Sequence, residues 1–312
     1  MIYPNRLTTA PGLRRAGRTT IDTDPQQPLP IFADHARDWQ QNHYVYPVVS
    51  RRSGGLSIGI NLNPDTACNF DCIYCQVDRS RSPRIRHVDP HRLEAELSAM
   101  IQQATDGSLF DHPRFADTPP ELRRLNDIAF SGDGEPTTCP VFAECVERTA
   151  RVRRSRRADD VRIVLITDAC YLTRPAVRAG LDIMDESGGE IWAKLDAGTQ
   201  EYYETVNRPN YPLTHVMDNI IAAATRYVVR IQSLFMNVRS QAPPDTEIDA
   251  YINRLREITA SGGRIRQVQV YTVARKPAQS YVTALTDAQL DAITDRVHRE
   301  TGLPAQAYYA AP

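Results

Sequence analysis

The stretch LSIGINLNPDTACNFDCIYC, residues 56–75, joins a strand-like segment to a crowded group of three cysteines. Ile58, Ile60 and Leu62 alternate with small or polar residues, which is the period of a β-strand with one apolar face. The cysteines follow at intervals of four and three residues, with Tyr74 directly before the last. The pattern predicts a strand that presents three thiols on the loop at its carboxyl end.

Five further short runs have a similar strand-like pattern: NDIAFSG, VRIVLITD, EIWAKLDA, YVVRIQSLF and RQVQVYTV. Between the runs, apolar residues recur at helical spacing. Examples are Leu93, Leu97 and Ile101, then Ile248, Ile252, Leu255 and Ile258, and finally Leu290, Ile293 and Val297. This alternation predicts an α/β fold with parallel strands and outer helices.

The strands have one aliphatic face and one partly polar face. In EIWAKLDA, for example, Trp192, Lys194 and Asp196 share the polar face. Polar rows on several strands need a common interior, which favours a closed or partly closed barrel over an open doubly wound sheet. The open sheet stays the alternative. In such barrels the reacting groups lie on loops after the strands, where the cysteines and GDGEP, residues 132–136, occur.

Composition describes an ordinary globular protein of 312 residues, 41% hydrophobic and 24% charged, with a formal net charge of −1. A mixed, nearly neutral charge indicates no global attraction to nucleic acid or to a membrane surface. No apolar run of about 18 residues occurs, and the N-terminus lacks the apolar core of a secretory signal. We therefore expect a cytoplasmic protein, in which crowded thiols indicate metal or redox chemistry rather than disulfides.

Three thiols at short spacing let one loop wrap its ligands around one zinc ion or iron–sulfur cluster. A structural zinc site normally has four protein ligands, and neither a second C-x-x-C pair nor a suitable histidine pair accompanies Cys68, Cys72 and Cys75. One ligand position is therefore expected to stay open. The other cysteines, Cys139, Cys145 and Cys170, have no paired spacing, so packing is favoured for them over an auxiliary cluster.

The pattern C-x3-C-x2-C with an aromatic before the third cysteine resembles the signature of the radical SAM superfamily. The resemblance implies that Cys68, Cys72 and Cys75 bind three irons of a [4Fe–4S] cluster, and that S-adenosylmethionine chelates the fourth. It implies a partial (β/α)6 TIM-type barrel. It also implies a reductant such as flavodoxin or ferredoxin, and cleavage of S-adenosylmethionine to a 5′-deoxyadenosyl radical that abstracts hydrogen from a substrate.

A second stretch, FSGDGEPTT at residues 130–138, is similar to the family's GGEP turn, which binds the methionyl amino group of S-adenosylmethionine. Asp133 stands in place of the first glycine. Gly134 permits close backbone approach, and Glu135 is expected to steady the loop. The resemblance implies cofactor contacts from Ser131, Gly132, Asp133, Gly134, Glu135 and Pro136.

The segment KLDAGTQEYYETVNRP, residues 194–209, is similar to enzymes related to tRNA 4-demethylwyosine synthase. That resemblance adds five candidate contacts with cofactor or substrate: Thr167, Lys194, Asp196, Gln232 and Tyr271. Lys194 is one of only two lysines, and the sequence leaves open whether it pairs with Asp196 or binds an anionic group of a cofactor. The tRNA-modifying relatives use further cysteines upstream of the motif, but no cysteine precedes Cys68 here.

The substrate therefore stays open between RNA, a peptide, a protein and a small metabolite. Arg79, Arg81, Arg84 and Arg86 follow the cysteine loop, where they are candidates to hold an acidic substrate or a phosphate. Nucleic acid is the less favoured partner, because the interleaved aromatic residues of a stacking platform are missing.

Two classes of function remain: a radical enzyme, and a non-catalytic iron–sulfur protein that carries electrons or senses redox state. The missing fourth cysteine and the GDGEP turn favour the enzyme. The chain divides into an N-terminal extension at 1–50, a core barrel at 51–275, and a C-terminal helix and accessory segment at 276–312. In the last part, Thr286 is the expected N-cap and Gly302 the expected helix stop.

Overall fold

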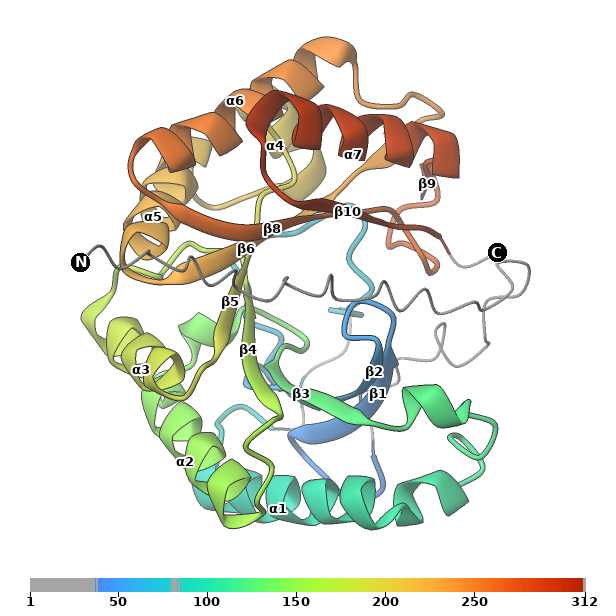
Figure 1. Cartoon of the computed structure of the whole chain (residues 1–312), viewed down its shortest axis with the longest axis vertical. Coiled ribbons are helices and arrows are strands. Elements are labelled where there is room, and N and C mark those ends of the chain that lie inside the picture. The colour runs from blue at the N-terminus through green and yellow to red at the C-terminus, as the bar shows by residue number, and fades with distance from the viewer. Residues whose placement is uncertain (1–36, 38, 80–82, 84, 311–312) are drawn as a thin grey trace, which may run out of the picture.

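The computed structural model describes the chain except residues 1–36, 38, 80–82, 84 and 311–312. Most of the predicted N-terminal extension therefore lies outside the described residues, as do Arg81 and Arg84 of the predicted substrate-facing arginines. In the described part, an eight-stranded sheet in the order β1-β2-β3-β4-β5-β6-β8-β10 curls into an incomplete barrel with helices on its outside (Figure 1). The predicted partial α/β barrel is confirmed.

The strands of the curled sheet are β1 (Val45–Ser50), β2 (Gly55–Ile60), β3 (Leu125–Phe130), β4 (Arg162–Thr167), β5 (Glu190–Lys194), β6 (Val228–Leu234), β8 (Arg264–Tyr271) and β10 (Ala305–Tyr308). The short strands β7 (Met236–Val238) and β9 (Val282–Ala284) form a separate antiparallel pair. The helices are α1 (Pro90–Asp106), α2 (Phe142–Ser155), α3 (Pro175–Glu186), α4 (Gln200–Asn207), α5 (Leu213–Arg226), α6 (Asp245–Ala260) and α7 (Asp287–Thr301).

All six strands predicted from the sequence are present, and each of them pairs in parallel with the next. At the C-terminal edge of the sheet, β10 pairs in parallel with β8. At the other edge, β1 pairs antiparallel with β2. Residues 45–50, assigned to the extension from the sequence, are therefore continuous with the sheet.

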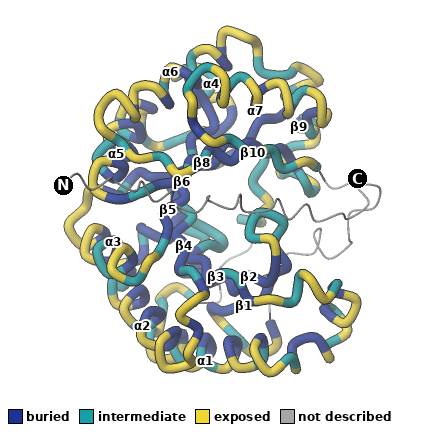
Figure 2. Tube along the Cα trace, in the orientation of Figure 1, coloured by how far each residue is buried: buried dark blue, intermediate teal, exposed yellow. Residues whose placement is uncertain are grey.

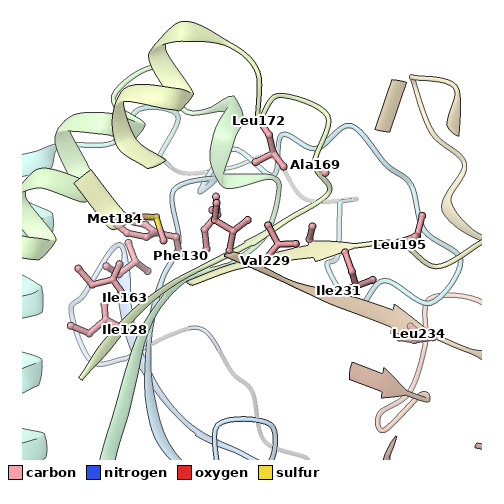
Figure 3. Close-up of a cluster of buried hydrophobic side chains, with 14 of the residues drawn as sticks. Ile128, Phe130, Ile163, Ala169, Leu172, Met184, Leu195, Val229, Ile231 and Leu234 are labelled. Atoms are coloured by element: carbon pink, nitrogen blue, oxygen red, sulfur yellow. The ribbon is translucent and has the colours of Figure 1, made fainter. Parts of the chain in front are cut away.

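The aliphatic rows of the strands point outward and are buried under the helices. Ile128 on β3, Ile163 on β4 and Met184 on α3 lie in one buried cluster (Figure 3). The exposed residues of the chain lie mainly on the outer faces of the helices (Figure 2). Burial of this apolar layer, worth about 25 cal/mol per Å² of apolar surface, stabilises the barrel from outside and leaves its inner face free for polar side chains.

The C-terminal helix has the two ends that the sequence predicts. The side chain of Thr286 accepts a hydrogen bond from the amide of Gln289, whose side chain in turn accepts one from the amide of Thr286. Gly302 ends the helix in the left-handed conformation, with φ at 71°. None of the helices in the described part is long and apolar enough to cross a membrane.

We predict that Thr286→Ala lowers the free energy of unfolding by about 1 kcal/mol, because α7 loses the side-chain acceptor for its first turn. Denaturant titration of the purified protein measures the change. Thr286→Ser keeps the acceptor and is expected to stay close to wild type. Equal stability of the alanine variant and the wild type would contradict the capping role.

Candidate active site

The three cysteines of the signature lie on the loop that follows β2. Cys72 is buried, whereas Cys68 and Cys75 are half-buried. The backbone of this loop is bonded to the end of α4: the amide of Asp71 donates to the carbonyl of Asn207 at 3.0 Å, and the amide of Ile73 donates to that of Val206 at 3.0 Å. The loop is therefore held as a rigid element.

Two buried carboxylates also hold side chains of the cysteine loop. Asn69 donates its amide to Asp168 Oδ2 at 3.0 Å, and the hydroxyl of Tyr74 donates to Asp196 Oδ2. Asp196 further accepts from Asn207 Nδ2 at 2.9 Å. The aspartates at the ends of β4 and β5 thus fix positions next to the first and third cysteines.

The GDGEP loop after β3 packs directly against the cysteine loop. The amide of Glu135 donates to the carbonyl of Ala67 at 2.9 Å. A methyl group added to Gly134 would lie 1.9 Å from the same carbonyl oxygen, which is much closer than two non-bonded atoms can approach. Gly134 therefore lets the two loops meet, which is a role in assembling the site in addition to the predicted approach to a cofactor.

Glu135 steadies its loop, as predicted. Its carboxylate accepts hydrogen bonds from Thr137 N at 3.1 Å, Thr167 Oγ1 at 2.7 Å and Asp168 N at 2.6 Å. Burial, together with the neighbouring Asp168, raises the pKa of Glu135 to about 8. The carboxyl group joins the loop after β3 to the loop after β4.

Asp133, which replaces the first glycine of the family turn, has two partners. It forms an ion pair with Arg37 and accepts from Asn61 Nδ2 at 2.7 Å. Its backbone amide donates to Asn61 Oδ1 at 3.1 Å. The substitution is thus accommodated by a polar residue directly after β2 and by a cation from the N-terminal segment.

Both loops open into one cavity of about 350 Å³ inside the barrel. Its lining includes the three cysteines, Ser131, Gly132, Asp133, Gly134 and Glu135, together with Thr167, Lys194, Gln232 and Tyr271 from the strands. The interior is mixed, because Ala129, Ile166 and Trp192 share the cavity lining with these polar residues. Pro136 and Asp196 do not line this cavity, so two of the predicted cofactor contacts lie outside it.

Lys194 pairs with Asp196, which is one of the two alternatives that the sequence offered. Its ammonium lies 3.3 Å from Asp196 Oδ2 and 3.1 Å from the hydroxyl of Tyr271, and 4.9 Å from the centre of the Tyr74 ring. Burial alone would lower the pKa of Lys194, but the negative charge of Asp196 outweighs it and raises the pKa. Lys194 is therefore a charged member of an ion pair on the cavity wall.

Gln232 offers an acceptor that the described residues do not use. Its Nε2 donates to Gln269 Oε1 at 2.7 Å, while its own Oε1 is buried without a hydrogen-bond partner. A buried amide oxygen without a partner costs free energy, which a ligand donor in the cavity would recover.

The three signature cysteines line one cavity. In the described residues, no three His, Cys, Asp or Glu side chains are close enough to hold one metal ion. Cys68, Cys72 and Cys75 instead line a common cavity, an arrangement that fits a cluster whose irons bind one thiolate each. Burial raises the pKa of Cys68 to about 12 and of Cys72 to about 11, so metal binding must displace their protons.

The remaining cysteines pack as the sequence predicts. Cys139, Cys145 and Cys170 are buried, and Cys145 lies on the inner face of α2. Sequence reasoning missed Asn69, Asp168 and Asn207. Two of them could have been found from their position in the sequence. Asn69 lies between two signature cysteines, and Asp168 directly follows β4.

Comparisons with known proteins point to distant relatives. No protein-family model matches the chain. It is 20% identical over 271 residues to GTPase Obg of Brachyspira hyodysenteriae, covering 86% of this chain and 35% of that protein. It is 24% identical over 238 residues to a UPF0026 protein of Methanocaldococcus jannaschii, covering 76% and 65%. The chain thus spans less than two thirds of the length of either relative.

Several solved structures share the fold of this chain over most of its length, although their sequences are only distantly similar. Streptococcus suis SuiB matches with a TM-score of 0.52 at 10% identity, over 83% of this chain and 51% of that one. SuiB bound to S-adenosylmethionine matches with a TM-score of 0.50 at 10% identity, over 83% and 49%. TYW1 with a lysine-pyruvate adduct bound has a TM-score of 0.47 at 12% identity, over 79% and 74%. The match to SuiB shows a shared fold.

We predict that Gly134→Ala lowers the iron bound after anaerobic reconstitution, because the added methyl group pushes Ala67, and with it Cys68, out of place. Iron analysis and the optical spectrum measure the loss. Pro136→Ala lies in the same turn but not in the cavity lining, and is expected to keep its iron. Full iron binding by Gly134→Ala would contradict the close contact between the loops.

Proposed function

We propose that this chain is a radical S-adenosylmethionine enzyme. One observation carries the proposal: the cysteine loop after β2 and the GDGEP loop after β3 are in direct contact and line the same cavity. A ligand in that cavity can therefore touch the thiols and the glycine-rich turn at once. Chelation of S-adenosylmethionine to an iron–sulfur cluster requires both.

In this proposal Cys68, Cys72 and Cys75 hold a [4Fe–4S] cluster through their thiolates. Ser131, Gly132 and Gly134 form the wall that receives the methionyl end of S-adenosylmethionine. A cluster held there would supply the one electron that splits S-adenosylmethionine into methionine and the 5′-deoxyadenosyl radical needed for hydrogen abstraction from the substrate. The chemistry is that of the two cofactors, and the protein positions them.

The side chains on the inner faces of β5, β6 and β8 are proposed to orient cofactor and substrate. Gln232 presents a free acceptor and Tyr271 a hydroxyl to the cavity. Lys194 contributes a positive charge that its ion pair with Asp196 holds in one place. Side chains fixed on a wall of this kind hold bound groups in a defined geometry.

Two other functions are less well supported. An electron carrier usually surrounds its cluster with four protein ligands, whereas Cys139, Cys145 and Cys170 do not line the cavity that the signature cysteines share. A GTPase needs a phosphate-binding loop with a Gly-Lys pair, but the two lysines follow Ala193 and Arg275. The cysteine and GDGEP loops bind the cofactors in this proposal and are compatible with a substrate that is RNA, a peptide or a small molecule.

Formation of 5′-deoxyadenosine tests the proposal. The reconstituted and reduced protein is expected to form it slowly from S-adenosylmethionine without any substrate, and Cys72→Ala is expected to lose both the iron and the product. Chromatography with mass detection measures the yield. The matched control is Cys145→Ala, which removes a buried thiol outside the cavity and should keep both. A fully loaded and reduced wild type that forms none would favour an electron carrier.

A further inference from the structure

Three arginines of the cavity wall come from the two edges of the curled sheet. Arg51 and Arg52 belong to the turn between β1 and β2, at one end of the curled sheet, and Arg275 follows β8 near the other end. All three line the cavity that also contains the signature cysteines. The incomplete barrel brings cations from its two edges to the same space.

Among the described residues, none of the three forms an ion pair with a carboxylate. Arg51 donates to the backbone carbonyl of Tyr309, and Arg52 lies over the Tyr271 ring, 5.0 Å from its centre. Arg275 Nη1 donates to Gln76 Oε1 at 3.0 Å, while its Nε is buried without a hydrogen-bond partner. Guanidinium donors are therefore left available in the cavity.

Other cations of the cavity are satisfied by negative or polarisable partners. Arg37 is paired with Asp133, Lys194 with Asp196, and Arg79 Nη1 donates to Cys75 Sγ at 3.4 Å. Asp127 also faces the cavity, but its carboxyl group accepts from Ser57 Oγ, and burial raises its pKa. Asp127 is an acidic neighbour of Arg52, whereas Arg275 has three cationic neighbours, so the excess of positive charge is on the wall near Arg275.

The lowered pKa of Arg275 indicates a positively charged surrounding that a bound anion would stabilise. Burial, and then repulsion by Arg52, Arg37 and Arg51, lowers the pKa of Arg275 to about 9. Neighbouring cations in a partly desolvated space destabilise one another, and a bound anion removes that cost. A group of cations without acidic partners is better suited to binding an anionic ligand than to stabilising the fold.

We propose that Arg51, Arg52 and Arg275 bind the phosphate group of a small phosphorylated substrate, an inference that rests on the proposed function. A phosphate monoester carries up to two negative charges and three acceptor oxygens, one for each guanidinium. A carboxylate has one charge and two oxygens, which leaves one arginine unsatisfied.

Isothermal titration of the reconstituted full chain with inorganic phosphate tests the site, at ionic strength matched with chloride. Arg52→Gln and Arg275→Gln are expected to weaken binding about tenfold or more, because each removes a charged hydrogen-bond donor. Arg275→Lys keeps the charge and should retain more affinity than Arg275→Gln. The matched control, Lys276→Gln, removes an adjacent cation that does not line the cavity and should bind as wild type.

Equal affinity in the wild type and both glutamine variants, folded by circular dichroism, would overturn the site. Tighter binding of citrate than of phosphate would overturn the choice of phosphate. Binding of a short single-stranded oligonucleotide without binding of phosphate would overturn the small-molecule class in favour of nucleic acid. Wild type that cleaves S-adenosylmethionine but binds no phosphate contradicts only this inference, whereas phosphate binding without cleavage supports the site and contradicts the proposed enzyme.

Discussion

The buried carboxyl group of Glu135 is the interaction on which the site depends. It bonds to the loop after β4 through Thr167 and Asp168, while its own backbone amide bonds to Ala67, next to the first signature cysteine. A buried carboxyl group without partners would cost several kcal/mol, so these bonds restrict the loops to one arrangement. The cysteine loop, the GDGEP loop and the end of β4 therefore form a single unit.

Asp168 and Asp196 extend this unit to both ends of the cysteine loop. Asp168 holds Asn69, and Asp196 holds Tyr74 while it also pairs with Lys194. The residues that carry the chemistry in our proposal are thus positioned by buried acids at the ends of neighbouring strands. Because the loops are already ordered, binding of a cofactor does not have to offset the conformational entropy lost in ordering them.

Local sequence pattern was sufficient for the six central strands and the signature residues, but it did not predict β1, β7 or β9. Period-two runs located the six central strands, and the polar face of β5 placed Lys194 on the inner wall. Pattern could not reveal partners that meet only when the sheet curls, such as Asn69 with Asp168 or Arg52 with Tyr271. It named Asp196 as a candidate contact and as a possible partner of Lys194, and the structure shows Asp196 buried, paired with Lys194 and outside the cavity lining. Spacing within a strand gives the face of a residue but not its depth.

The central claim is that the two loops form one site for a cluster and S-adenosylmethionine. Electron paramagnetic resonance of the reduced, reconstituted protein tests it most directly, because a cofactor that chelates one iron changes the spectrum of the whole cluster. The account predicts a [4Fe–4S] signal that shifts when S-adenosylmethionine is added. A cluster signal that stays identical at saturating S-adenosylmethionine would contradict it.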